Sequence, residues 1–122
     1  MKSPHKHRTG PTHVWHATLI ALAGLRAAWQ HEEAFRQEVL IAAVAVTVAL
    51  LSSVDGIGKA LMVASILLVL IVELLNSAIE AAVDHASLEF HLLAKRAKDI
   101  ASAAVLASIV NALVVWGLVL LC

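Results

Sequence analysis

Three long apolar stretches dominate the pattern of hydrophobic and polar positions along this 122-residue chain. They predict membrane-spanning helices over about residues 39–54, 57–85 and 100–121. The first, at about 16 residues, is near the short limit for crossing a bilayer, whereas the other two are long enough. The pattern therefore predicts an all-α membrane protein.

The segment before the first span has a mixed pattern. From about residue 13 to residue 37, groups of apolar positions alternate with charged ones, and tryptophans lie near both ends. This segment carries too many charges for a span, so we expect an amphipathic helix in the membrane surface, with a break before Glu32. Residues 1–12 are polar and basic and contain proline and glycine, which predicts a flexible cytoplasmic tail before a single domain over residues 13–122.

One face of the second span is polar although the helix around it is apolar. The residues of this polar stripe are Glu73, Asn76, Ser77, Glu80 and Asp84. Their spacing puts them on one face of a helix that turns 100° per residue. Polar groups at membrane depth are costly and usually have a function. From the residues alone, the stripe could join helices by hydrogen bonds, form a proton or ion pathway, or catalyse a reaction.

Composition agrees with a membrane protein. Hydrophobic residues make up 61% of the chain and charged residues 15%, compared with about 45–50% and 25% in soluble domains. The net charge is +0, so no overall basic field suggests a nucleic-acid partner. The single cysteine, Cys122, excludes an intramolecular disulfide.

The distribution of lysine and arginine predicts the orientation. With three spans, the N-terminus and the expected loop over residues 89–99 share one side of the membrane, and that side holds every lysine and arginine except Lys59. The positive-inside rule places this side in the cytoplasm and the C-terminus on the opposite side. The polar stripe approaches the cytoplasmic face, where ATP is available.

Several side chains at that face suit a nucleotide. Mg²⁺ prefers oxygen ligands and keeps several waters, so Glu32 and Glu80, together with nucleotide phosphates, would suffice to hold it. Lys98 can meet a phosphate, and Glu89 and Asp99 could accept hydrogen bonds from the nucleotide. The five glycines are scattered and form no Walker loop, so a nucleotide site must be assembled from side chains.

Glu73 lies deeper in the predicted membrane than the rest of the polar stripe. A lipid hydroxyl held at the interface would be within its reach, and Glu73 could accept the hydroxyl proton. If the polar stripe is catalytic, Glu73, with Asn76, is therefore the candidate for the chemical step, while the other two roles stay open.

Four segments together resemble one family, the small integral-membrane diacylglycerol kinases of bacteria. They are Gly24-Leu-Arg-Ala-Ala-Trp29, Glu32-x-Ala-Phe-Arg-Gln-Glu38, Glu73-x-Leu-Asn-Ser-Ala-Ile-Glu80 and Ala97-Lys-Asp-x-x-Ser-Ala-Ala-Val105. The resemblance covers the chain from about Ala17 onward. It implies a homotrimeric bundle of three-span protomers in the bacterial inner membrane. It also implies transfer of the γ-phosphate of MgATP to diacylglycerol, which gives phosphatidic acid.

The resemblance also implies roles for individual residues. Glu73 matches the proposed general base, and Glu32 and Glu80 match carboxylates that hold the metal and ATP. The remaining nucleotide contacts would be Glu89, His91, Lys98 and Asp99. Lipid contacts would come from Arg26, Trp29, Ala34, Phe35, Arg36, Gln37, Glu38, Glu73 and Ser102.

The chain departs from the family pattern in its first helix. Ile20 and Ala21 stand where the family commonly has an aromatic residue followed by serine, and His13 stands where it often has arginine. Contacts that those family side chains make to ATP or lipid are therefore not carried over to this chain.

Two other functions are alternatives to a diacylglycerol kinase. Undecaprenol kinases of the same family share the Glu-x-x-Asn-x-x-x-Glu core, but the Arg-Ala-Ala-Trp and Ala-Phe-Arg-Gln-Glu segments resemble the diacylglycerol type more. A small proton-coupled transporter could use Glu73 as its carrier, but it would leave Glu32, Glu89, Lys98 and Asp99 without a role. We also expect active sites between protomers, because a lone protomer should shield Glu73 and Asn76 poorly from lipid.

Overall fold

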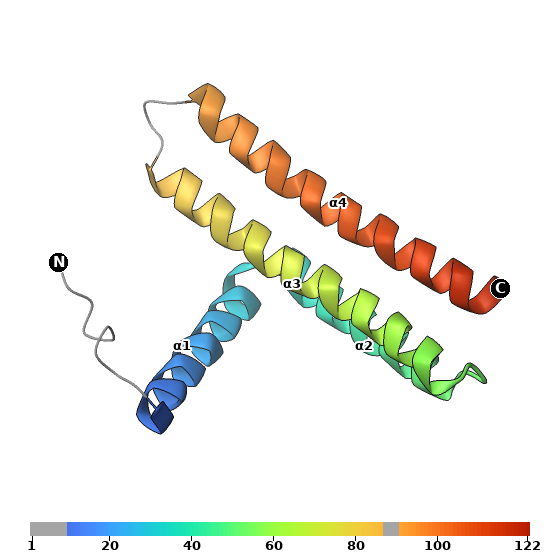
Figure 1. The fold of residues 1–122 in the computed structure, drawn as a ribbon. Coiled ribbons are helices and arrows are strands. Elements are labelled where there is room, and N and C mark those ends of the chain that lie inside the picture. Colours follow the sequence, from blue (N-terminus) through green and yellow to red (C-terminus); the bar gives the residue numbers. More distant parts are fainter. Residues whose placement is uncertain (1–9, 87–90) are drawn as a thin grey trace.

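The computed structural model describes residues 10–86 and 91–122 of the chain, and these form four helices (Figure 1). They are α1 (Gly10–His31), α2 (Glu33–Leu51), α3 (Gly56–Ala86) and α4 (His91–Leu121). Three stretches are long and apolar enough to cross a membrane, namely Glu33–Leu51, Gly56–His85 and Leu92–Leu121. The expected class, an all-α protein with a first helix and three spanning helices, is confirmed.

Helix α3 is the centre of the arrangement. Helices α2 and α4 both pack against it, and α1 packs against α2 (Figure 1). A short turn after α2 leads into α3, and the Asp55 carboxylate caps the start of α3 by accepting a 2.8 Å hydrogen bond from the Gly58 backbone N–H. Any side chain at Gly58 would collide with Val54 of the turn and crowd Val119 of α4, so glycine allows the turn and α4 to approach the start of α3 closely.

The corner between α1 and α2 lies at Glu32. This residue is extended, with φ −117° and ψ 100°, and α1 turns away from α2 there (Figure 1). The Arg36 guanidinium donates hydrogen bonds to the carbonyls of Trp29 at 2.6 Å and Gln30 at 3.3 Å. These carbonyls belong to the last turn of α1, where no helical partner is available, so Arg36 stabilises the corner.

Two helix bounds differ from the expectation. The helix of the first span begins at Glu33 rather than at 39, and α4 begins at His91, so Lys95 and Lys98 lie in a helix and not in a loop. Both segments contain good helix formers and no proline or glycine. An ion pair of 2.7 Å between Lys95 and Asp99, one turn apart, further favours the helical form of the second segment.

Small residues fill most of the contacts between helices. The buried apolar side chains are Ala28, Phe35, Ala42, Ala49, Met62, Ala101 and Ala112. Alanine lets helix backbones approach closely, as is common in membranes. A polar contact joins the first part of α3 to the last part of α4. The Trp116 indole N–H donates to the Met62 carbonyl at 3.2 Å and to the Ser65 hydroxyl at 3.1 Å.

Candidate functional site

The deep end of the polar stripe of α3 faces the protein, not the lipid. Glu73 is only 7% exposed and Asn76 only 9% exposed within a single chain. Our reason for expecting sites between protomers, that one protomer shields these side chains poorly, is therefore wrong. The helix turns its polar face inward because a polar group is less costly against protein than against hydrocarbon.

Glu38 of α2 meets Glu73 inside the bundle, with the two carboxyl groups within hydrogen-bonding reach of each other. A hydrogen bond between two carboxyl groups requires one proton between them. Glu38 Oε2 is buried and has no hydrogen-bond partner among the described residues. The site therefore holds two facing carboxyl groups, one on α2 and one on α3.

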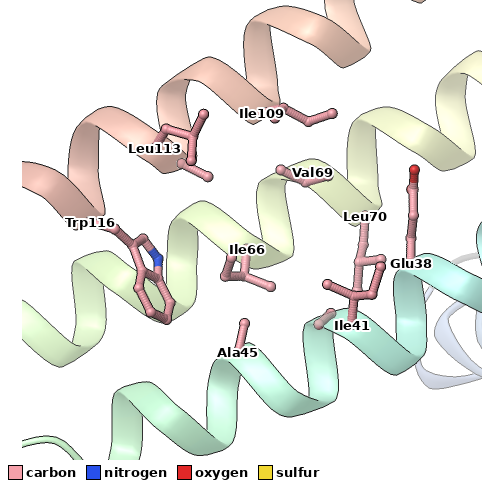
Figure 2. A pocket seen from close by; sticks show the side chains of 11 residues that line it. Glu38, Ile41, Ala45, Ile66, Val69, Leu70, Ile109, Leu113 and Trp116 are labelled. Atoms are coloured by element: carbon pink, nitrogen blue, oxygen red, sulfur yellow. The ribbon is translucent and has the colours of Figure 1, made fainter.

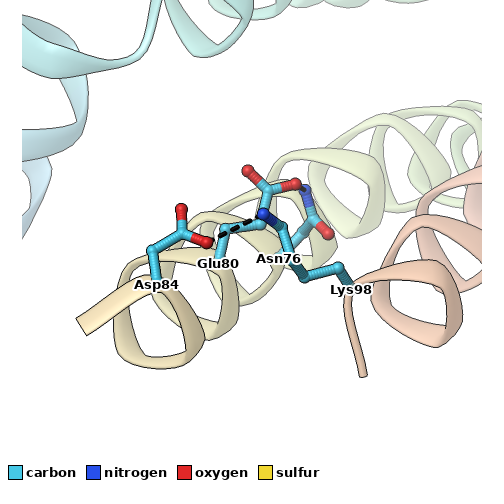
Figure 3. Close-up of polar contacts among 4 residues, drawn as sticks. All are labelled: Asn76, Glu80, Asp84 and Lys98. Carbon is cyan, nitrogen blue, oxygen red and sulfur yellow. Dashed lines mark hydrogen bonds and ion pairs between the residues drawn. The ribbon is translucent and has the colours of Figure 1, made fainter. Parts of the chain in front are cut away.

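Asn76 connects the buried end of the polar stripe to Glu80. Its Nδ2 donates a 3.1 Å hydrogen bond to Glu80 Oε1, one turn closer to the end of α3 (Figure 3). The Asn76 Oδ1 atom is buried and lacks a partner within residues 10–86 and 91–122. Because buried polar atoms are nearly always paired, this second open acceptor indicates a place for an absent donor.

The charges of Glu32 and Glu80, which lie on different elements, both influence the Glu73 carboxyl. Glu32 lies at the corner between α1 and α2, and Glu80 lies on α3, yet the charges of both act on Glu73. The described part of the chain contains no group of three or more His, Cys, Asp or Glu side chains that could enclose a metal. Two carboxylates fit an ion that takes its other ligands from phosphates and water.

Lys98 of α4 reaches across to α3. Its ammonium lies 2.8 Å from the Asp84 carboxylate and also interacts electrostatically with Glu80 (Figure 3). Asp99, the next residue, instead pairs with Lys95 and lines a separate hollow on α4 with Leu92. A single chain therefore brings Lys98 to Glu80 but not Asp99.

The predicted lipid contacts lie in different surroundings. Phe35 and Glu73 are buried and Glu38 is half-buried. Arg36 donates a hydrogen bond to a backbone carbonyl at the corner between α1 and α2, and the remaining predicted contacts are exposed. The exposed ones are Arg26, Trp29, Ala34, Gln37 and Ser102. Two predicted nucleotide contacts, Glu89 and the side chain of His91, lie outside the described residues.

An apolar groove of about 370 Å³ runs between α2, α3 and α4. Glu38 and Trp116 lie at opposite ends of it, with aliphatic side chains such as Ile66 and Leu113 between them (Figure 2). The Glu38 end is next to Glu73. An apolar channel thus leads to the carboxyl pair.

Comparison with known proteins decides the family. The model of the family described as prokaryotic diacylglycerol kinase matches residues 19–120. The chain belongs to this family. Diacylglycerol kinase of Pseudomonas aeruginosa is 50% identical over 119 residues, which are 98% of this chain and 97% of the relative. Diacylglycerol kinase of Escherichia coli K12 is 48% identical over 112 residues, 92% of each chain, and that of Helicobacter pylori strain 26695 is 41% identical over 108 residues, covering 88% and 84%.

Membership of the diacylglycerol kinase family confirms the resemblance found in the four sequence segments. The undecaprenol alternative is not favoured, because the relatives named here are diacylglycerol kinases.

Sequence reasoning missed three features of this diacylglycerol kinase family member. They are the contact between Glu38 and Glu73, the pairing of Lys98 with Asp84, and the groove that ends at Trp116. Each joins different helices, so no periodicity within one helix reveals it. The one available signal was that Glu38 is an acidic residue beside an apolar run, as Glu73 is.

Proposed function

We propose that the protein is an ATP-dependent lipid kinase that transfers the γ-phosphate of MgATP to the hydroxyl of diacylglycerol, giving phosphatidic acid and ADP. The family and the names of the relatives support this activity. The observation that carries the proposal is the polar face of α3. It runs from buried Glu73, through Asn76 and Glu80, to the exposed Asp84, which pairs with Lys98 of α4. Such a face connects a lipid substrate to a water-soluble one.

Glu73 is the proposed general base. The lipid hydroxyl oxygen forms a bond to the γ-phosphorus while the bond from that phosphorus to the β–γ bridging oxygen breaks, and the hydroxyl proton passes to Glu73. Phosphoryl transfer depends mainly on alignment and charge stabilisation. Glu38 would hold the Glu73 carboxyl in place, and the open acceptor of Asn76 would accept a hydrogen bond from the substrate.

The phosphates are proposed to lie at the exposed end of the stripe. Glu32 and Glu80 would hold Mg²⁺, which neutralises phosphate charge when bound. Asn76 orients Glu80 through its hydrogen bond, and Lys98 would meet the phosphates as a point charge. Glu89, His91 and Asp99 remain proposed nucleotide contacts.

The groove supports a path for the lipid. An acyl chain in it would contact aliphatic side chains, and its polar end would reach Glu38 beside Glu73. Arg26 and Trp29 of α1, both exposed, are proposed to contact the headgroup region.

We further propose a homotrimer in the bacterial inner membrane, with the N-terminus in the cytoplasm. Large apolar side chains are exposed along all three spanning helices, for example Leu40, Leu67 and Leu113, so they suit contact with lipid or with other copies. A neighbouring protomer could also complete the site near Asp99, which one chain leaves apart from Lys98.

The test is diacylglycerol-dependent phosphate transfer from labelled MgATP in mixed micelles, comparing the wild type with Glu73→Gln. The amide keeps the shape of the side chain but cannot accept the proton, so we expect at least about a 100-fold loss of kcat. Binding of a non-hydrolysable MgATP analogue should stay within about twofold. A variant that keeps more than about a tenth of the activity contradicts the base assignment.

A further inference from the structure

Asp84 and Lys98 form the ion pair that joins α3 to α4 at the exposed end of the polar stripe. The Lys98 ammonium lies 2.8 Å from Asp84 Oδ1, and the side chains are 40% and 62% exposed. Such exposed pairs usually contribute little to stability, because water and salt screen them. The stability of the fold therefore depends little on this pair. Its effect on the position of the Lys98 ammonium is the more important one.

Lys98 has two acidic neighbours on α3. Asp84 holds the ammonium directly, and Glu80, one helical turn away on the same helix, attracts it as well. Glu80 already accepts a hydrogen bond from Asn76. Without the Asp84 carboxylate, Glu80 is the acidic group of α3 toward which Lys98 would turn, and the ammonium would then occupy a carboxylate that the proposed function needs for MgATP.

Because the lysine side chain is long and flexible, a carboxylate that restricts the position of its ammonium can favour ligand binding. A free lysine side chain samples many rotamers, and binding a phosphate must restrict them. An ion pair with Asp84 restricts them beforehand, while its weakness lets the ammonium turn to a more highly charged triphosphate.

We propose that Asp84 is a positioning residue that keeps the Lys98 ammonium beside Glu80 without letting it pair with Glu80, so that both are available to the nucleotide. This inference rests on the proposed function, in which Lys98 meets the phosphates. It assigns to Asp84 an effect on MgATP binding and none on the chemical step.

The test compares Asp84→Asn with the wild type in the full-length protein. Asp84→Asn should raise the KM for MgATP, and the Kd of a non-hydrolysable MgATP analogue measured by calorimetry, about three- to tenfold. The kcat at saturating MgATP and the thermal midpoint should stay close to the wild-type values. Asp84→Glu keeps the carboxylate, so its KM should stay within about twofold of the wild type.

A matched control lies at the other end of α3. Asp55→Asn makes the same substitution at an exposed aspartate, and asparagine can still accept the hydrogen bond from the Gly58 N–H. Its KM for MgATP and kcat should not change. If Asp84→Asn also leaves KM and Kd unchanged, or lowers kcat and the thermal midpoint together, the positioning role is overturned.

Two further variants separate this inference from the function on which it rests. Lys98→Met should raise the KM for MgATP by at least as much as Asp84→Asn. An unchanged KM in Lys98→Met would contradict the phosphate contact itself, whereas a raised KM there with a normal KM in Asp84→Asn would overturn only the role of Asp84. The charge-swapped double variant D84K/K98D restores an ion pair but places a carboxylate at position 98, so MgATP binding should stay weak, and full recovery of binding would overturn the role of Asp84 as a positioning residue for Lys98.

Discussion

The two halves of α3 satisfy their buried polar groups to different degrees. In the half that begins at Gly56, the Ser65 hydroxyl donates a hydrogen bond to the Met62 carbonyl and accepts one from Trp116, so this buried group is paired both as donor and as acceptor. In the half that begins at Glu73, Asn76 Oδ1 is buried without a partner among the described residues. Glu38 Oε2, on the neighbouring helix α2, is likewise buried without a hydrogen-bond partner among these residues.

This difference separates structural from functional polarity. Polar groups that join helices are saturated, because an unpaired group inside the membrane is costly. The buried acceptors without partners among the described residues lie around the Glu73 end of α3, where we propose that the lipid hydroxyl and the nucleotide bind. Substitutions around the Glu73 end should therefore lower activity, whereas substitutions in the half that begins at Gly56 should lower stability and leave activity nearly unchanged.

The largest effect after loss of Glu73 is expected at Glu80. Glu80→Gln removes a proposed ligand, so the Mg²⁺ concentration for half-maximal activity should rise about tenfold or more, and Asn76→Ala should shift it in the same direction because Asn76 orients Glu80. Removing divalent cations with EDTA should stop transfer by the wild type. Activity measured across a Mg²⁺ titration checks all three, and an unchanged titration curve for Glu80→Gln would argue against the ligand role.

A smaller effect is expected at Glu38, the partner of Glu73. Glu38→Leu leaves the buried Glu73 carboxyl without its hydrogen bond, which should lower the free energy of unfolding by about 1–3 kcal/mol. It should also lower kcat about tenfold, because the base is no longer held in place. Glu38→Gln can donate to Glu73 and should keep both properties near the wild type. Thermal unfolding and kinetics of the two variants provide the measurement, and equal activity in both would exclude a positioning role.

The smallest effect is expected in the saturated half. Ser65→Ala removes one hydrogen bond to the Trp116 indole, which keeps its bond to the Met62 carbonyl. We expect a loss of about 0.6 kcal/mol, typical of hydrogen bonds between membrane helices. Lipid phosphorylation should stay within about twofold. A large loss of activity with unchanged stability would erase the contrast between the two halves.

The helices and the presence of a polar stripe on one face of α3 were accessible from the sequence, because long apolar runs and a 3.6-residue period determine both. That one chain buries the deep end of this stripe was not predicted, because burial depends on how the helices pack. The helix ends were harder to predict from the sequence. Glu33 and Lys95 are charged, as residues outside a membrane span often are, yet they lie in helices because no neighbouring residue breaks a helix. The partner of Glu73 could not be predicted, because it depends on the register of α2 against α3. The same reason applies to Lys98, whose choice of Asp84 over Asp99 depends on how α4 faces α3.

The most direct test of the central claim is phosphate transfer from labelled MgATP, with diacylglycerol and undecaprenol offered in parallel in mixed micelles. We expect labelled phosphatidic acid, little or no labelled undecaprenyl phosphate, and no transfer when the lipid hydroxyl is absent. Product mainly on undecaprenol would keep the mechanism and contradict the substrate. Transfer to neither lipid, by folded protein that binds MgATP, would contradict the claim that the open acceptors around Glu73 form a diacylglycerol kinase site.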